Sequence, residues 1–343
     1  MPQRERDTRI DAAKGIGIIT VIAGHIFWGE GLVCLTVFTF HMPLFFFISG
    51  LFYRDTGLPA KQYILQRARS RLWPVVLACL VSFPISMLVP AWRQNFSLPN
   101  VFRDLYLGVP SLSLLDPAWF MFSLFEIEVA FYFYQKYKEE HEDRLFVLLA
   151  LLALPVFTVL VAEKVDPYLP YGRMPWRLDS SIMGFVFFAL GYWSRATILG
   201  GQGVNRKWRP GVAILGAAGI ALAVRLNGSV NISTLAFGDV FLYLFGALSG
   251  IVVVLLLGIP VARSRWLNLL GRHTLFILLS HNLVLRFYAL ISSYMTKEPY
   301  HLRGHLSQWW ALGGTVLTVF VMSLCCLVIE RMRAAKANLE QAE

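Results

Sequence analysis

Long apolar runs separated by short polar connections dominate this chain of 343 residues. Each run is close to the roughly 20 residues that a helix needs to cross the hydrocarbon core of a bilayer. The pattern predicts an all-α integral membrane protein with about ten transmembrane helices. The runs lie at about 10–28, 34–53, 72–91, 117–136, 145–162, 179–198, 210–226, 236–259, 270–293 and 306–330.

Basic residues in the connections predict the orientation of these helices. Lys and Arg are concentrated in the N-terminal lead, the even-numbered loops and the C-terminal tail, and cytoplasmic loops carry such an excess. Both termini are therefore expected in the cytoplasm. The first run contains charged residues, and no Ala-x-Ala cleavage site follows it, which indicates an uncleaved first span. We expect residues 1–343 to form a single transmembrane domain without a fused soluble domain, multi-pass in the inner (cytoplasmic) membrane.

The amino-acid composition limits the classes of molecule that this protein is expected to bind. Charged residues make up 15% of the chain, against about 25% in a typical soluble domain. The net charge of +10 lies in short loops, as membrane orientation requires, so lipids and not nucleic acid are the expected partners. Cys34, Cys79, Cys325 and Cys326 have no metal or redox spacing, and no zinc motif, phosphate loop or nucleophile elbow is present. We expect no metal; the oligomeric state stays open.

Two ionisable residues in the first run give the strongest functional signal. Lys14 and His25 are eleven residues apart, which on a helix places them within roughly 20° of one stripe and about 16 Å apart along the axis. A lone histidine is often a satisfied core residue, and a lysine near a helix end often reaches out to the interface. Two such residues on one stripe favour function, because ionisable groups in a membrane span are costly. Asp11, one turn before Lys14, is placed to pair with it.

The second loop predicts an anion site. Arg67, Arg69 and Arg71 alternate just before the run that begins at residue 72. Orientation of the membrane helices explains part of this charge. Guanidinium groups also bind phosphate bidentately, and a helix beginning at this point would add its positive dipole end. The arginines are therefore candidates for the phosphates of a nucleotide-like donor.

Further polar residues lie in or beside the apolar runs. His41 and Ser49 belong to the second run, and either a packing or a binding role suits them. Glu126 and Glu128 lie two residues apart, so on a helix they point about 200° apart and at most one faces a given cavity well. Candidate contacts for an anionic glycan or for lipid phosphates are the basic residues of the predicted outer loops, Arg93, Arg103, Lys164, Arg173 and Arg177. The remaining candidates are Asp116, Asp179, His281 and Arg286.

Several of these segments together resemble the membrane-bound acyltransferase 3 family, and within it bacterial sugar O-acetyltransferases similar to fucose-4-O-acetylase. The most specific are the basic residue at position 14 with His25 and the segment Phe40-His-Met-Pro-Leu-Phe-Phe-Phe-Ile-Ser-Gly50. Weaker matches are the arginines before Leu72-Trp-Pro74, Trp119-Phe120, Trp176-Arg-Leu-Asp179 and the segment from Leu270 to His281.

The resemblance implies a ten-span fold with cytoplasmic termini, acetyl-coenzyme A as the cytoplasmic donor and a glycan or lipid-linked sugar hydroxyl as the outward-facing acceptor. It implies that His25 is the catalytic base, with Lys14 as its basic partner. The arginines 67, 69 and 71 would bind the donor, although they depart from the family's pair of arginines three apart.

The interpretation of the remaining residues completes the predicted site. Asp11 or Glu128 would orient the ring of His25, and Lys14 and Ser49 would lie near the donor. Whether an acyl-histidine intermediate forms and whether the group is acetyl or larger stay open. Candidate contacts for the acceptor are His41, Glu126, Asp116, Trp119, Asp179 and His281.

Two other classes of function remain. Ten spans with buried charges also fit a secondary transporter or exporter of a sugar or lipid-linked intermediate. Against it, the chain shows no repeated half with paired Gly/Pro-broken segments. A structural subunit of a glycan-assembly complex is the third interpretation, and it predicts no binding of a donor.

Overall fold

The protein is all-helical in the ranges that its computed structural model describes, residues 6–27, 31–94, 96–110, 115–140, 144–201, 203–297 and 308–342. Short 3₁₀ segments link several helices, and a single isolated β-bridge joins Asn231 to Ala236 within those ranges. The α-helices are α1 (Thr8–Ile26), α2 (Leu32–Leu51), α3 (Ala60–Leu88), α4 (Pro90–Arg93), α5 (Leu98–Leu107), α6 (Trp119–Glu140), α7 (Arg144–Lys164), α8 (Leu178–Leu199), α9 (Arg209–Asn227), α10 (Val240–Gly258), α11 (Arg265–Arg272), α12 (Thr274–Thr296) and α13 (Gln308–Ala342).

Within the described ranges, every apolar run of the sequence is helical over most of its length, and the run at 270–293 covers the end of α11 and most of α12. Among the described residues, 7 helices are long and apolar enough to cross a membrane: α2, α3, α8 with the turns before it, α9, α10, α12 and α13. Helices α1 and α6 carry more charge, since α1 alone contains Arg9, Asp11 and Lys14. The chain is thus a multi-pass membrane protein. The count of about ten spans and the cytoplasmic termini stay predictions.

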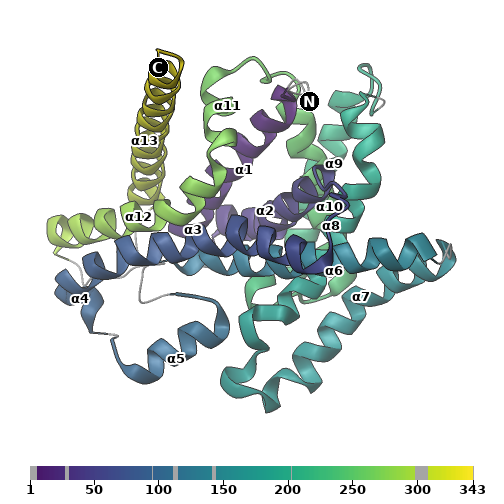
Figure 1. Cartoon of the computed structure of the whole chain (residues 1–343), viewed down its shortest axis with the longest axis horizontal. Helices are drawn as coiled ribbons and strands as arrows, with labels where there is room; N and C mark the ends of the chain where they lie inside the picture. Colours follow the sequence, from purple (N-terminus) through teal and green to yellow (C-terminus); the bar gives the residue numbers. More distant parts are fainter. Residues whose placement is uncertain are drawn as a thin grey trace. The chain divides into compact units, whose positions relative to one another are not determined.

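The chain folds into two compact units, residues Met1–Val37 with Val252–Glu343 and residues Phe38–Ile251. In the first unit, α1 packs against α11, α12 and α13, and α11 runs alongside α1 (Figure 1). Glycines permit this approach: a Cβ on Gly15 would collide with the carbonyl oxygen of Leu267, and one on Gly271 with that of Asp11. The prediction of a single domain over 1–343 stays a prediction.

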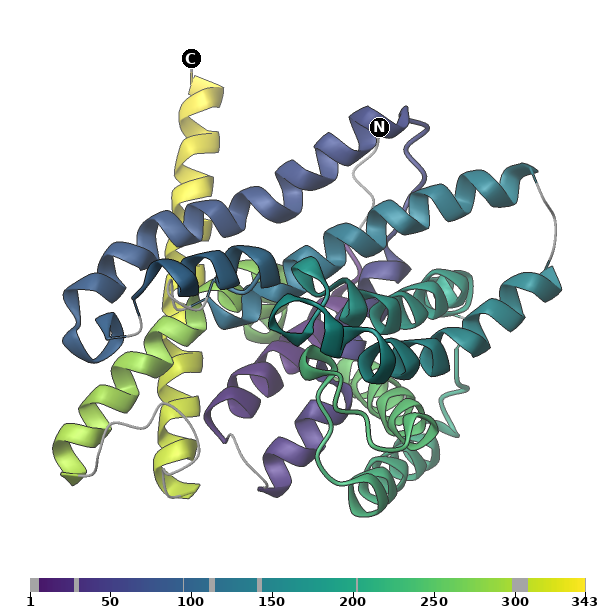
Figure 2. The same cartoon turned by 90° about the horizontal axis from the view of Figure 1, so that it is seen from below.

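The second unit is built around an aromatic core. Helix α3 runs alongside α6 (Figure 2), and the stacked rings of Tyr63 and Tyr132 join the two helices at a centroid distance of 4.5 Å. Helices α2 and α8 approach closely because Gly50 lies against the backbone of Phe188. A Cβ on Gly191 would likewise meet the backbone of α2. These contacts fix the backbone of the helices that carry the polar residues of this unit.

One predicted boundary is wrong in a way that matters for the site. The third apolar run begins at residue 72, but α3 already begins at Ala60 after Pro59. The amphipathic first turns were not part of the apolar run, so the hydrophobic pattern alone placed the start too late. The three arginines therefore lie inside the helix, about two to three turns from the positive end of its dipole at residue 60.

Candidate functional site

Two imidazoles meet in the first unit. His25 lies in the last turn of α1, and His281 lies in α12. The centroids of their rings are 5.2 Å apart, with the ring planes tilted by 45°. His281 is fully buried, whereas His25 retains partial exposure. The sequence singled out both residues, but not their contact, because it depends on how α1 and α12 pack.

A hydrogen bond within α12 sets the tautomer of His281. Its Nδ1 lies 2.8 Å from the carbonyl oxygen of Ile277, one turn earlier in the helix. A carbonyl oxygen only accepts, so Nδ1 must carry the proton and donate it. In the neutral ring Nε2 then holds a lone pair and accepts hydrogen bonds.

The other end of α1 carries an ion pair. Lys14 Nζ lies 2.7 Å from Asp11 Oδ1, so the pair that the sequence indicated is present, and Arg6 Nε lies 2.9 Å from Asp11 Oδ2. Because α1 is continuous, Lys14 and His25 share its stripe about 16 Å apart. Asp11 is fourteen residues from His25, about 21 Å along the helix. It therefore does not orient the ring of His25, and that alternative is wrong.

In the second unit Glu128 holds two of the three arginines. Its carboxylate accepts hydrogen bonds from Arg71 Nε at 2.9 Å and Nη2 at 2.6 Å, and Arg67 Nη1 lies 3.6 Å away. The guanidinium of Arg67 also lies over the ring of Tyr63, 4.9 Å from its centroid. Arg69 is exposed. Because α3 is helical here, Arg67 and Arg71 share a face, and Arg69 points about 160–200° away.

This geometry changes the interpretation of the arginine cluster. The three side chains do not form one cradle, and Arg71 is neutralised by a buried carboxylate that is 4% exposed. Arg67 and the exposed Arg69 therefore remain the candidates for binding an anion. Glu128 belongs to the second unit, and its role in orienting His25 stays a prediction.

Glu126 faces a different helix from Glu128, as the spacing of two residues predicted. Its Oε2 accepts a hydrogen bond of 2.6 Å from the hydroxyl of Ser181 at the start of α8. Glu128 points instead towards α3. The two carboxylates therefore belong to separate polar clusters.

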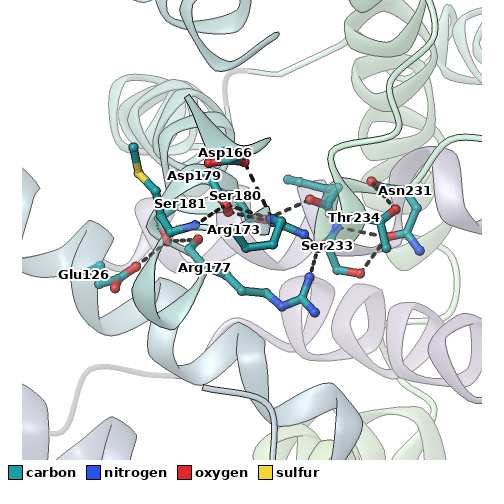
Figure 3. A network of polar contacts seen from close by, with 12 residues as sticks. Glu126, Asp166, Arg173, Arg177, Asp179, Ser180, Ser181, Asn231, Ser233 and Thr234 are labelled. Atoms are coloured by element: carbon teal, nitrogen blue, oxygen red, sulfur yellow. Dashed lines mark hydrogen bonds and ion pairs between the residues drawn. The ribbon is translucent and has the colours of Figure 1, made fainter. Parts of the chain in front are cut away.

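Asp179 is the centre of the larger of these clusters (Figure 3). Arg173 donates to both of its carboxylate oxygens, at 2.8 and 2.6 Å, and also to the hydroxyl of Ser180 and the carbonyl oxygen of Ser233. Asp166 approaches the same guanidinium at 3.7 Å. No surface of Asp179 is exposed, so a substrate would reach it only if this segment moved. Arg173 thus ties the connection before α8 both to Asp179 and to the turn at residues 232–234.

The connection itself holds an unusual backbone. Tyr171, Trp176 and Arg177 have φ values of 58°, 52° and 61°, a left-handed conformation that residues with a side chain rarely adopt. Arg177 donates to the carbonyl oxygen of Ser233 as well. At the start of the connection, burial and the neighbouring carboxylate of Asp179 raise the pKa of Asp166 above its usual range. Arg173, Arg177 and Asp179 could each be singled out from the sequence, but their association in one network could not.

Arg173 and Arg177 were among the candidate contacts for an anionic glycan or for lipid phosphates. The structure corrects this, because both guanidinium groups instead bind groups inside the protein.

Four further candidates lie in the second unit. The ring of His41 is 4% exposed and contacts Phe38 edge-on at 4.9 Å. The hydroxyl of Ser49 donates to the carbonyl oxygen of Phe45 at 2.7 Å, a bond within α2. Trp119 is 7% exposed in the aromatic core, and Asp116 is half-buried at the start of the turn before α6. These placements indicate packing roles for His41 and Trp119, and their predicted contacts with an acceptor stay predictions.

No cluster with the composition of a metal site is present among the described residues. What the structure defines, over the described ranges, is an all-helical, multi-pass membrane protein. Two histidines meet between helices of its first unit, and buried ion pairs join segments of its second unit. A family model described as an acyltransferase domain matches residues 7–329. The chain belongs to the acyltransferase 3 family. No curated protein matches it significantly.

Proposed function

We propose that this protein transfers an acetyl group from acetyl-coenzyme A to a hydroxyl of a sugar in a cell-surface or lipid-linked glycan. The donor would bind from the cytoplasm, the acceptor would lie on the outer side, and the protein would reside in the cytoplasmic membrane. Membership of an acyltransferase family supports acyl transfer, and the contact between His25 and His281 is the observation that carries the site.

The chemistry assigned to His25 is that of a general base. Its imidazole removes the proton of the sugar hydroxyl while the oxygen attacks the thioester carbonyl. The new C–O ester bond forms, the C–S bond breaks, and the proton held by His25 passes to the departing thiolate. The products are an O-acetyl sugar and a free thiol, so no further reactant is needed. The last turn of α1 suits this role, because the helix dipole favours a positive charge at that end.

Donor binding is assigned to α3, through Arg67 or through Arg69, because these two side chains lie on opposite faces of the helix. Arg71 is engaged by Glu128, whereas Arg69 is exposed and Arg67 is 3.6 Å from the same carboxylate. Guanidinium groups match the geometry of phosphate, and the donor carries several phosphates. Replacing both arginines should therefore raise the KM for the donor more than it lowers kcat.

The test uses membrane vesicles that contain the full-length protein, radiolabelled acetyl-coenzyme A and a parallel arm with succinyl-coenzyme A. His25→Ala should lower the transfer of label into the glycan fraction by at least about 100-fold, the lower range of positioned acid–base help. Arg67→Ala with Arg69→Ala should raise the donor KM. The control Lys61→Ala replaces an exposed cation in the first turn of the same helix and should leave both constants unchanged.

The outcomes separate the classes of function. Near-normal transfer by a folded His25→Ala variant would remove His25 from the mechanism. A protein that binds neither coenzyme A ester yet moves sugar across the membrane would be a transporter. Preferential use of succinyl-coenzyme A would keep the acyltransferase and correct the acyl group.

A further inference from the structure

His281 makes two contacts that do not involve a substrate, and packing around it confines α12 and α1. Its Nδ1 donates to the carbonyl oxygen of Ile277, and its ring contacts that of His25. The adjacent Ser280 donates to Met322 Sδ at 3.2 Å, which joins α12 to α13. Close packing also confines the end of α1, since a Cβ on Gly314 of α13 would collide with the side chain of Ile26.

The separation of the two rings suits a hydrogen bond between ring nitrogens. Two imidazoles joined by an N–H···N bond of about 2.9 Å have centroids about 5 Å apart, because each nitrogen lies about 1.2 Å from its ring centre. The observed centroid distance is 5.2 Å. Hydrogen bonds of catalytic groups often tighten only when substrate is bound, so the tilt of 45° is compatible with this arrangement.

The tautomer of His281 decides which partner can donate. The carbonyl oxygen of Ile277 accepts the hydrogen bond of the protonated Nδ1, which leaves Nε2 of the neutral ring as the acceptor. His25 becomes a donor at both nitrogens when it takes the proton of the acceptor hydroxyl. The hydrogen bond between His25 and His281 is therefore strongest when His25 is charged. An interaction that strengthens as the reaction proceeds lowers the activation barrier, whereas one that is equally strong throughout only improves binding.

We propose that His281 is the positioning residue of His25: Nε2 of its neutral imidazole accepts a hydrogen bond from the imidazolium that His25 forms during transfer. This inference rests on the proposed function. It assigns to a second histidine the orienting task that a carboxylate performs beside many catalytic histidines. It also replaces the expectation that His281 contacts the acceptor, because the side chain is fully buried.

The substitutions at position 281 separate shape from hydrogen bonding. His281→Phe keeps a planar ring and removes the acceptor, whereas His281→Gln places an amide oxygen near the position of Nε2. We expect His281→Phe to lower kcat about 10- to 100-fold, part of the effect of the base itself, with the donor KM unchanged. His281→Gln should recover a measurable part of that loss. Ser292→Ala, another fully buried polar position of α12, is the matched control and should keep normal kcat.

The assay is the vesicle transfer of radiolabelled acetyl-coenzyme A, with a pH profile of kcat and thermal unfolding of each purified variant. Loss of kcat in a variant that unfolds at the normal temperature, with rescue by Gln, supports the proposal. Normal kcat for His281→Phe overturns it, and so does a raised acceptor KM at unchanged kcat, which would identify a substrate contact. If His281→Phe misfolds, the Gln and Asn variants decide, since Asn reaches only as far as Nδ1 and should not rescue. Failure of His25→Ala to lose activity would instead overturn the proposed function itself.

Discussion

Removing the carboxylate of Glu128 should destabilise the second unit strongly. The side chain of Glu128 is 5% exposed and faces two guanidinium groups, that of Arg71 at 2.6 Å and that of Arg67 at 3.6 Å. Breaking a buried ion pair from one side costs about 3–5 kcal/mol, because the partner charge stays buried and uncompensated. The two arginines keep 25% and 19% exposure, so water can partly replace the lost partner. We therefore expect Glu128→Ala to lower the free energy of unfolding by about 3 kcal/mol.

Glu128 contacts two arginines, whereas Arg71 contacts one carboxylate, so the two single variants should differ in their cost. Arg71→Ala leaves Glu128 with Arg67, so its cost should be smaller than that of Glu128→Ala. The double variant should cost less than the sum of the two, with a coupling of about 0.5–3 kcal/mol. Lys336→Ala is the control, because it breaks an exposed pair with Glu340 that is worth no more than about 0.5 kcal/mol.

The measurement is reversible unfolding in mixed detergent micelles, followed by far-ultraviolet circular dichroism and tryptophan fluorescence. Coincident transitions from the two probes would justify a two-state free energy. A Glu128→Ala variant within about 0.5 kcal/mol of the unmodified protein would refute the reasoning, since a cost this small is typical of an exposed pair. It would also favour the role that the sequence predicted for Glu128, the orientation of the ring of His25, over a role in stability.

Two further predictions concern packing and titration. Gly271→Ala should destabilise the first unit by about 1–3 kcal/mol, as overpacking does, because the added Cβ meets the carbonyl oxygen of Asp11. The control is Gly211→Ala in α9, where the space is open, and it should be neutral or slightly stabilising in the same thermal melt. Burial and the carboxylate of Asp179 raise the pKa of Asp166 in the folded protein. The folded state then holds its proton more tightly than the unfolded state, so the contribution of Asp166 to stability should fall as pH rises above about 3.9, the ordinary value, towards neutrality. Asp166→Asn should flatten this slope in melts between pH 4 and pH 8, and an unchanged slope would contradict it.

The helices could be predicted from the sequence, and their partners could not. Apolar runs near the length of a membrane span identify helices because lipid requires every backbone group to be bonded internally. The same pattern failed at α3, whose polar first turns precede the run. Helical periodicity would have separated Arg69 from Arg67 and Arg71 if the helix had been expected to begin at residue 60.

In the candidate site, too, single residues could be predicted from the sequence and contacts between distant residues could not. His25 was identifiable because an imidazole in a membrane helix is costly. Its contact with His281 joins residues far apart in the chain, and no spacing rule predicts it. The same is true of Arg173, which a charge count places in a loop but which binds Asp179 and the turn at residues 232–234. Within one helix, by contrast, the spacing of Lys14 and Asp11 sufficed to predict their pair.

The connection before α8 has a consequence for how this protein tolerates change. Left-handed backbone at three residues with side chains costs about 1–3 kcal/mol each, and such conformations persist only where the surroundings enforce them. Here the enforcing group is the bidentate bond between Arg173 and Asp179. A variant that loses this clamp frees Tyr171, Trp176 and Arg177 to relax together, so the whole connection should change shape as one piece and not residue by residue.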